Sequence, residues 1–258
     1  MLTIEQIEQG YEERLRPFKR NILREYLQYK ILDIIFNSEY SNKLIFMGGT
    51  ALRIVYGNTR FSEDLDFDNL GLSEKEFENL SLLVKKGLEL EGYKVEVNNI
   101  FKGAYRCVIK LPEILFNNKL SVIEEEKIMI QIDTVPQGFN YISDRKIINK
   151  FDVFTEIAVV PLSVLLSQKL FAIFNRKRDK GRDFYDVLFL LQLIKPDYRY
   201  LKDKIGIVDG LALKKKLLSK INDSNLEELS KDVEPFLFNP NDSKKILLFG
   251  DYIKQIDL

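Results

Sequence analysis

Two short motifs constrain this chain more than any other part of its sequence. Residues 47–50 read Met-Gly-Gly-Thr, and after a gap of thirteen residues, residues 64–66 read Asp-Leu-Asp. The run that leads into the glycines, residues 43–47, is short and mostly apolar, which favours a buried strand. Gly48 and Gly49 then allow the backbone to turn sharply and to approach a ligand closely.

A helix is expected to begin directly after this glycine turn. It opens at Thr50, continues through an apolar stretch and ends near Gly57. Backbone N–H groups at a helix N-terminus attract phosphate, and the Thr50 hydroxyl adds a donor. Gly48, Gly49 and Thr50 are therefore candidates for holding the phosphates of a nucleotide, although the same sequence is also typical of an ordinary strand-to-helix turn.

The second motif carries two carboxylates at the spacing of a β-strand. Side chains two residues apart on a strand share one face, so Asp64 and Asp66 point the same way, while Leu65 and Phe67 point towards the core. Two unpaired carboxylates this close repel one another, and a hard cation such as Mg²⁺ relieves the repulsion. The other interpretation is a solvated strand face or turn, since Asp-rich segments are often loops.

A third carboxylate is expected from a neighbouring strand. Residues 127–136 alternate isoleucine with other residues, which places Asp133 on the face opposite to the isoleucines, and Pro136 ends the strand. An Asp near a strand end is equally typical of a turn. With Asp64 and Asp66 it forms a set of three carboxylates that suits two metal ions, which clamp the attacking and leaving oxygens of a phosphoryl transfer.

These motifs resemble a known family. Gly49, Thr50, the thirteen-residue gap and the two carboxylates resemble the signature of the nucleotidyltransferase superfamily, which has the DNA polymerase β-like fold. The wider sequence is similar to the AbiEii-type toxins of abortive-infection and type IV toxin–antitoxin systems, a group that includes the MenT enzymes. The likeness spans roughly residues 20–195. It is carried by residues 46–53 (Phe-Met-Gly-Gly-Thr-Ala-Leu-Arg), 60–67 (Arg-Phe-Ser-Glu-Asp-Leu-Asp-Phe), 169–172 (Lys-Leu-Phe-Ala) and 182–186 (Arg-Asp-Phe-Tyr-Asp).

The two later motifs fall on predicted helices. In the first helix, from residue 162 to about 176, Lys169 lies in an apolar stripe, where a lysine either extends its amine to water or meets an anion. The resemblance favours a triphosphate contact, since lysine binds phosphate as a compact point charge. At the start of the second helix, Asp183 is either a capping acid or orients Lys169 in the active site. We prefer Asp183 to Asp186, which is expected to point further around the helix.

Further cations surround these motifs. Five of the seven residues at 176–182 are Lys or Arg, a run that is typical of a solvated loop but can also bind a triphosphate or an RNA backbone. Arg53 and Arg60 flank the glycine motif, and Arg60 is the better phosphate candidate because it precedes the carboxylate strand in a predicted loop. The formal net charge is zero, which argues against a uniformly basic nucleic-acid coat.

Composition excludes several other kinds of chemistry. The 258 residues include no histidine, which rules out Ser-His-Asp triads, Cys-His pairs and histidine-containing zinc sites. The one cysteine, Cys107, precludes an intrachain disulfide and fits a reducing cytoplasm, where we expect the protein to act. Hydrophobic residues make up 45% and charged residues 30%, as in a soluble globular protein. No apolar run approaches the ~20 residues needed to span a bilayer, so no membrane partner is expected.

The expected fold class is α+β. Residues 1–155 are predicted to form a nucleotidyltransferase domain, with N-terminal helices and a mixed sheet flanked by helices. Residues 156–258 are predicted to form a helical C-terminal domain packed on it. Capping-box patterns at Thr3 and Ser73 predict helix starts, and two strands joined by a turn at residues 102–103 precede the Asp133 strand.

These expectations describe an enzyme that moves a nucleoside monophosphate from an NTP to a hydroxyl and releases pyrophosphate. The resemblance implies an RNA acceptor, the tRNA 3′ end, a growth-inhibiting outcome and a cognate antitoxin. Two alternatives stay open, namely transfer to a small molecule and a non-catalytic module that binds NTP or RNA. The residues expected to act are the Mg²⁺ or Mn²⁺ ligands Asp64, Asp66 and Asp133, the triphosphate contacts Gly48, Gly49, Thr50, Arg60 and Lys169, and the orienting residue Asp183.

Overall fold

A mixed β-sheet organises the N-terminal part of the chain. The computed structural model describes residues 2–258, and within that range seven strands form one sheet in the order β3-β4-β5-β2-β1-β7-β6. The β1–β7 and β2–β5 pairs are parallel, and the other neighbours are antiparallel. The strands are β1 (Leu44–Met47), β2 (Leu65–Asn69), β3 (Glu96–Lys102), β4 (Ala104–Leu111), β5 (Ile128–Val135), β6 (Asp144–Lys150) and β7 (Val153–Val159).

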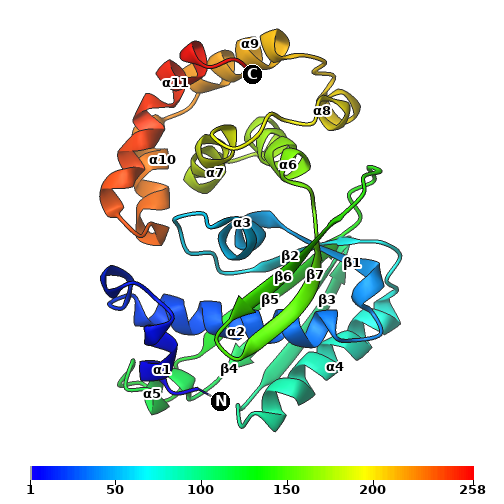
Figure 1. Ribbon diagram of the computed structural model, residues 1–258, viewed down its shortest axis with the longest axis vertical. Coiled ribbons are helices and arrows are strands. Elements are labelled where there is room, and N and C mark those ends of the chain that lie inside the picture. Colours follow the sequence, from blue (N-terminus) through cyan, green and yellow to red (C-terminus); the bar gives the residue numbers. More distant parts are fainter. Residues whose placement is uncertain (1) are drawn as a thin grey trace. The chain divides into compact units, whose positions relative to one another are not determined.

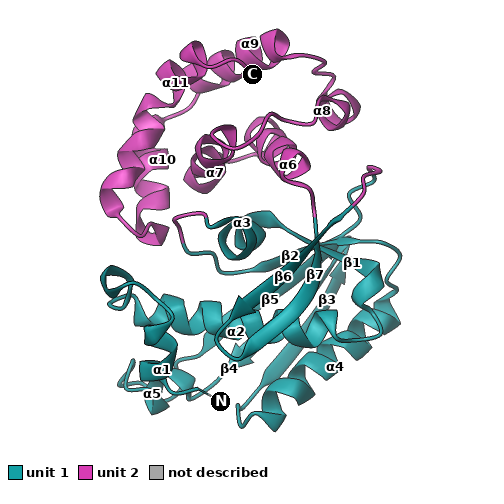
Figure 2. Ribbon diagram, viewed as in Figure 1, with its two compact units in different colours: residues 1–57, 61–138, 143–159 teal, residues 58–60, 139–142, 160–258 magenta. Residues whose placement is uncertain are grey.

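Contacts divide the chain into two compact units, which Figure 2 shows in different colours. Unit 1 comprises residues 1–57, 61–138 and 143–159, and it holds the whole sheet. Unit 2 comprises residues 58–60, 139–142 and 160–258. The division therefore falls at residues 159 and 160, whereas the sequence suggested 155 and 156, and two short segments from the first half cluster with the second.

Both units contain several helices, labelled in Figure 1. Those of unit 1 are α1 (Ile4–Gln9), α2 (Lys19–Phe36), α3 (Gly48–Tyr56), α4 (Glu74–Leu90), α5 (Ile114–Asn117) and the 3₁₀ turns η1 (Glu13–Leu15) and η2 (Ser41–Lys43). Those of unit 2 are α6 (Leu162–Asn175), α7 (Gly181–Leu191), α8 (Tyr198–Ile205), α9 (Gly210–Asn222), α10 (Leu226–Val233), α11 (Phe249–Gln255), η3 (Glu234–Phe236) and η4 (Pro240–Leu248).

The two faces of the sheet have different covers. Alternation along the strands sends Phe67 of β2 to one face, where its ring packs on Phe36 of α2 with centroids 6.2 Å apart. Phe77 of α4 meets Phe101 of β3 in the same way at 6.1 Å. Helices α2 and α4 thus cover the apolar face, and both can be followed along the sheet in Figure 1. Strand residues that alternate with these aromatics, such as Asp66 beside Phe67, point to the opposite face.

Most elements of unit 1 agree with the sequence patterns. Capping boxes are present at Thr3 and Ser73. Each of these side chains accepts a hydrogen bond from the backbone N–H three residues later, and the side chain of that later residue accepts one from the backbone N–H of the cap. Helix α3 ends at Gly57, whose left-handed φ of 74° suits glycine. Strand β6 and the short helix α5 were not predicted, because residues 144–150 are largely polar and residues 114–117 make only one turn.

Unit 2 is helical, as the sequence indicates. Helix α7 packs against α6 and α10, and Gly181 makes the second contact fit, because a Cβ there would collide with the carbonyl oxygen of Leu229. The apolar side chains of Phe184 and Phe249 meet in its core at 5.1 Å between centroids. No helix among residues 2–258 is both long and apolar enough to cross a bilayer.

Candidate active site

The sheet brings two of the predicted carboxylates together. Asp66 of β2 and Asp133 of β5 are direct partners in the parallel register of these strands, so their side chains lie on the same face. That face is opposite to the one covered by α2 and α4. Asp64 lies one residue before β2 rather than within it, and it is half-buried like Asp66 and Asp133.

The glycine turn adjoins this carboxylate pair. Gly48 has a φ of 78°, and a Cβ built on it would overlap the Asp66 carboxylate. Glycine is therefore required at this position for two reasons, the left-handed backbone and the space that Asp66 occupies. Met47, the residue before the turn, pairs with Asp66 across β1 and β2. The turn and the acidic strand are thus parts of one local structure.

Thr50 connects the same two segments through its side chain. It is fully buried, and its hydroxyl donates a short hydrogen bond to the backbone carbonyl of Asp64. The hydroxyl is used within the chain, where it fixes the backbone that carries Asp64. Within the described residues, no side chain caps the N-terminus of α3, and Gly48 and Gly49 supply its first positions. Backbone N–H groups are thus the main phosphate donors that this turn offers.

Arg106, which sequence patterns did not single out, occupies the carboxylate face. It is the antiparallel partner of Asp133, and its Nε donates to Asp133 Oδ1 at 2.7 Å. Gln131 donates to the other carboxylate oxygen at 2.6 Å. The hydrogen bond to Asp133 raises the pKa of Arg106, and the charges of Asp64 and Asp66 raise it further. The Arg106 guanidinium therefore interacts electrostatically with all three carboxylates.

This arrangement bears on whether the carboxylates suit a metal ion. Among residues 2–258, no group of three or more Asp, Glu, His or Cys side chains is gathered tightly enough to hold one. The carboxylates of Asp64, Asp66 and Asp133 nevertheless share one cation, and carboxylate oxygens are the ligands that Mg²⁺ and Mn²⁺ prefer. The chemistry of these donors therefore suits a divalent cation, although their oxygens are not gathered around one point in this structure.

A second acidic cluster lies in unit 2 and is built differently. Asp186 of α7 is completely buried, and Arg60 grips it with two bonds of 2.7 Å. Lys169 of α6 lies 2.9 Å from the same carboxylate, and Asn58 donates to it at 2.8 Å. Burial alone would raise the pKa of Asp186, but Arg60 and Lys169 outweigh it and lower the pKa to about 2. Asp186 is ionised and fully paired.

Three predicted site residues meet in this cluster. Lys169 also bonds Asp183 at 3.1 Å, and Arg176 reaches Asp183 at 2.8 Å. Asp183 lies in the first turn of α7, whose N-cap is Lys180, so Asp183 is not the cap. Asp186, which was expected to point further around the helix, lies at the centre of this network. The Arg60 side chain is only 2% exposed, so it serves Asp186 rather than solvent.

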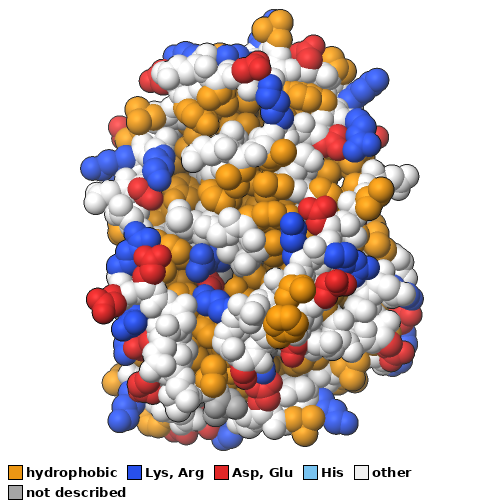
Figure 3. Space-filling view, viewed as in Figure 1, with side chains coloured by type: hydrophobic (Ala, Val, Ile, Leu, Met, Phe, Trp, Pro, Cys, Tyr) orange, Lys and Arg blue, Asp and Glu red, His pale blue; other side chains and the backbone are white. Residues whose placement is uncertain are grey.

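The basic loop at residues 176–182 is held by acids of the same unit. Arg178 lies 3.4 Å from Glu228, Asp179 binds Lys220 at 2.8 Å, and the Gly181 N–H donates to Asp232 at 2.8 Å. Arg53, on α3 in unit 1, likewise pairs with the buried Glu25 at 2.8 Å. Figure 3 shows the same mixture over one face of the molecule, where cationic and anionic side chains are interspersed. The net charge of zero is thus distributed pair by pair.

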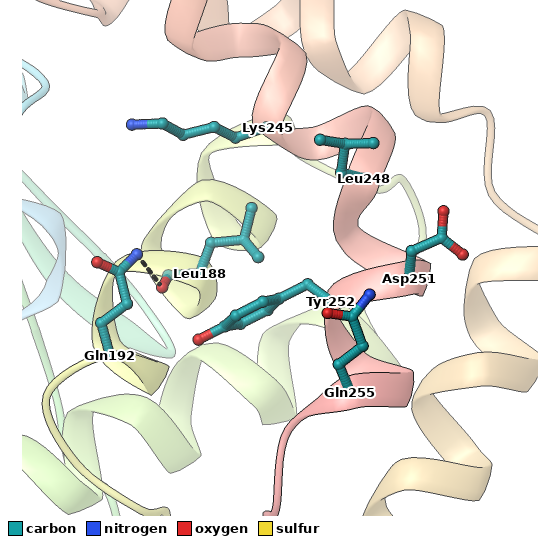
Figure 4. A pocket seen from close by; sticks show the side chains of 7 residues that line it. All are labelled: Leu188, Gln192, Lys245, Leu248, Asp251, Tyr252 and Gln255. Carbon is teal, nitrogen blue, oxygen red and sulfur yellow. Dashed lines mark hydrogen bonds between the residues drawn. The ribbon is translucent and has the colours of Figure 1, made fainter.

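One cavity in unit 2 lies among residues that no motif singled out. Its volume is about 520 Å³, and its walls come from α7, η4 and α11. Figure 4 shows the Tyr252 ring between Gln192 and Gln255, with Gln192 donating to the Leu188 carbonyl at 3.1 Å. None of the predicted catalytic or phosphate-binding residues lines it.

Comparisons with known proteins show which family the chain resembles. A family model described as "Nucleotidyl transferase AbiEii toxin, Type IV TA system" matches residues 30–239. The crystal structure of JHP933 from Helicobacter pylori is similar, with a TM-score of 0.59 and 19% identity over 91% of this chain and 90% of that one. A candidate nucleotidyltransferase from H. pylori is similar with a TM-score of 0.57 and 18% identity, over 90% and 94% of the two chains. A search of curated proteins finds no match.

These likenesses identify the class of protein and then the family. At such low identity the solved structures establish only a shared fold, which has a mixed sheet, flanking helices and a helical C-terminal region. The family model covers most of the chain. The chain therefore belongs to the nucleotidyl transferase AbiEii toxin family of type IV toxin–antitoxin systems, and the predicted fold class and enzyme class are confirmed.

Proposed function

We propose that this protein transfers a nucleoside monophosphate from an NTP to an RNA 3′-hydroxyl, with Mg²⁺ or Mn²⁺ held by Asp64, Asp66 and Asp133. The observation that carries the proposal is the register of β2 and β5, which sets Asp66 opposite Asp133 on the face beside the glycine turn. A structural sheet face has no need of two facing carboxylates, since like charges directly opposite one another are destabilising.

In this proposal the acceptor oxygen attacks the α-phosphorus of the NTP. A new P–O bond forms, the bond between the α-phosphorus and the bridging oxygen breaks, and pyrophosphate leaves with the electron pair. The metal ions supply charge neutralisation at the attacking and leaving oxygens. We propose that Asp133, which completes the site from β5, accepts the hydroxyl proton. The rate enhancement comes from positioning and electrostatics rather than from a covalent intermediate.

The triphosphate is assigned to the glycine turn and the N-terminus of α3. Gly48 and Gly49 expose backbone N–H groups there, and the helix dipole favours negative charge. Thr50 supports this site indirectly through its bond to Asp64. Contacts from Lys169, Asp183 and Arg60 to the substrate stay predictions from the family resemblance. What supports Lys169 is its charge, since Asp186 and Asp183 outweigh burial and raise its pKa.

The acceptor and the partner protein are proposed on family membership. AbiEii toxins are one half of a type IV toxin–antitoxin pair, which supports a cognate antitoxin as partner. We propose tRNA as the RNA acceptor and the cytoplasm as the compartment. A growth-inhibiting outcome follows if the modified RNA can no longer be used.

A transfer assay tests this proposal. The protein is incubated with total tRNA, each α-³²P-labelled NTP in turn, and Mg²⁺, and the RNA is resolved by gel. We expect label on the tRNA 3′ end with one or a few nucleotides, and no label in EDTA or with Asp66→Asn.

The other outcomes separate the alternatives. Label that appears only with small-molecule acceptors supports a small-molecule nucleotidyltransferase. NTP or RNA binding without any transfer, unchanged in Asp66→Asn, supports the non-catalytic module and contradicts the proposal.

A further inference from the structure

We infer that Arg106 is an internal counter-cation of the metal site: it holds Asp133 when no divalent ion is bound and is released to a phosphate group of the substrates when one is. The inference rests on the proposed function and adds a residue that belongs to none of its motifs. The phosphate belongs either to the NTP or to the RNA backbone, and the two sources differ in the kinetic constant they affect.

The position of Arg106 suits this role. Its backbone is fixed opposite Asp133 in the β4–β5 ladder, while its neighbours Tyr105 and Cys107 point to the apolar face under α2 and α4. Arg106 therefore cannot leave the carboxylate face, and only its side chain can move. The guanidinium contacts Asp133 directly, and the charges of Asp64 and Asp66 also act on it.

The bond between Arg106 and Asp133 is one that a metal can replace. Its two contacts are unequal, 2.7 Å from Nε and 3.5 Å from Nη2, so the guanidinium does not form a symmetric fork. The Arg106 side chain is 45% exposed, and exposed ion pairs contribute little to stability. By contrast, Arg60 on Asp186 makes two equal bonds with full burial. Arg60 is thus held firmly by its carboxylate in unit 2, whereas Arg106 in unit 1 can give up its carboxylate to another cation.

Charge balance gives the exchange its direction. Asp64, Asp66 and Asp133 carry three negative charges, and Arg106 supplies one positive charge to them. A divalent cation neutralises more charge at shorter range, so its binding removes the attraction that holds Arg106. The released guanidinium, on a side chain that is already half exposed, then presents N–H donors in the fork geometry that recognises phosphate oxygens.

The test measures metal binding apart from catalysis. Free Mn²⁺ is titrated by electron paramagnetic resonance into the wild-type protein, Arg106→Met, Arg106→Lys and Arg145→Met. Arg145 is the matched control, an exposed arginine on β6 of the same sheet that lies 3.9 Å from Glu156 on the next strand. Arg106→Lys keeps the positive charge and serves if the methionine variant does not fold.

We expect Arg106→Met to bind Mn²⁺ about fivefold more tightly, because the ion then has no exposed ion pair to displace from Asp133. Arg106→Lys and Arg145→Met should remain within about twofold of the wild type. The tighter-binding variant should nevertheless transfer nucleotide less well. A raised KM for NTP assigns the released guanidinium to the triphosphate, and a raised KM for RNA assigns it to the acceptor.

Three results would overturn the inference. Unchanged or weaker Mn²⁺ binding in Arg106→Met, with normal binding in the wild type, contradicts it and leaves the proposed function standing. Tighter Mn²⁺ binding with neither KM altered contradicts the transfer of Arg106 to a phosphate. No Mn²⁺ binding in the wild type that depends on Asp66 contradicts the proposed function itself and the inference with it.

Discussion

Two acidic clusters in this protein balance the repulsion between their carboxylates in different ways. In unit 2, Asp183 and Asp186 are enclosed by Arg60, Lys169 and Arg176, so the negative charge is balanced by permanent partners. In unit 1, Asp66 faces Asp133 across the sheet, and the cation that the three acids share, Arg106, is half exposed. A buried charge needs a permanent partner to offset its lost hydration, whereas a half-exposed charge stays partly hydrated and can exchange its partner for a ligand.

The comparison teaches how to separate structural acids from functional ones. Both clusters combine Asp with Lys or Arg, so residue type alone does not distinguish them. Burial and partner geometry do. The unit 2 cluster should respond to mutation mainly through stability, and the unit 1 cluster mainly through metal binding and activity.

The largest effect is expected at Asp66. Asp66→Asn keeps the shape of the side chain and removes the charge, so we predict a loss of transfer of about 10³-fold or more, the order seen when a group that stabilises transition-state charge is removed. The free energy of unfolding should stay level or rise slightly, because carboxylate repulsion falls. Glu156→Gln, a neutralised acid at an exposed position on β7, is the control and should behave as the wild type. A folded Asp66→Asn protein with more than a tenth of wild-type transfer would contradict the assignment.

At Asp186 the order of effects should reverse. Asp186→Asn leaves Arg60 and Lys169 buried without their carboxylate, which costs about 3–5 kcal/mol of unfolding free energy. Urea denaturation followed by circular dichroism measures this value. A loss below about 1 kcal/mol would show that the buried network is not what stabilises unit 2.

Gly48 and Gly57 allow a matched comparison within one helix. Their φ angles are nearly equal, 78° and 74°. A Cβ added at Gly48 would overlap the Asp66 carboxylate, whereas a Cβ added at Gly57 would have no neighbouring atom within 4 Å. Alanine at either position should cost roughly 1–2 kcal/mol of stability from the left-handed backbone. Only Gly48→Ala should also displace Asp66 and lower transfer, by about 100-fold. Equal activity in the two variants would separate the glycine turn from the carboxylate site.

Acid should weaken unit 2 in a defined range of pH. The pKa of Asp186 is lowered from 3.8 to about 2, because Arg60 and Lys169 outweigh burial. A carboxyl whose pKa is lower in the folded state contributes its stability above the unfolded value and loses it as the pH falls from 3.8 towards 2. The contribution is about 2 kcal/mol. The stability gap between the wild type and Asp186→Asn should narrow by that amount between pH 6 and pH 2, and a constant gap would contradict it.

The smallest predicted effect is at Lys169. Lys169→Ala leaves Arg60 on Asp186 and Arg176 on Asp183, so the protein should stay folded. If the lysine also meets the triphosphate, the KM for NTP should rise about tenfold, as for the loss of one charged hydrogen bond. Lys215→Ala, at an exposed position on α9, is the control. Unchanged kinetics would show that Lys169 serves only Asp183 and Asp186.

Local patterns were enough to predict most of unit 1. The glycine turn, the Asp66 strand and the alternation around Asp133 are short-range signals that match the observed elements, although α3 already begins at Gly48 and Asp64 precedes β2. Alternation along residues 127–136 predicted the face of Asp133, whereas its direct pairing with Asp66 is set by the parallel register of β2 and β5. Strand β6 escaped prediction because its residues carry little apolar alternation.

Long-range partners could not be read from the sequence. Arg106 is one polar residue in an alternating strand, and only the β4–β5 register sets it against Asp133. Arg60 looked like a loop cation, but Asp186, which lies 126 residues further on, buries it. Helical spacing suggested that Asp183 faces inward and Asp186 does not, yet α7 is enclosed on both sides and buries both. Burial of this kind depends on what packs against a helix, which periodicity alone does not report.

In the proposed function, acids from β2 and β5 together bind divalent ions for nucleotidyl transfer. The most direct measurement is a Mn²⁺ titration by electron paramagnetic resonance, in the presence of a non-hydrolysable NTP, on the wild type and on the Asp66→Asn, Asp133→Asn double variant. The account predicts saturable Mn²⁺ binding in the wild type that is lost in the double variant while its Tm is retained. Equal Mn²⁺ binding by the two proteins would contradict it.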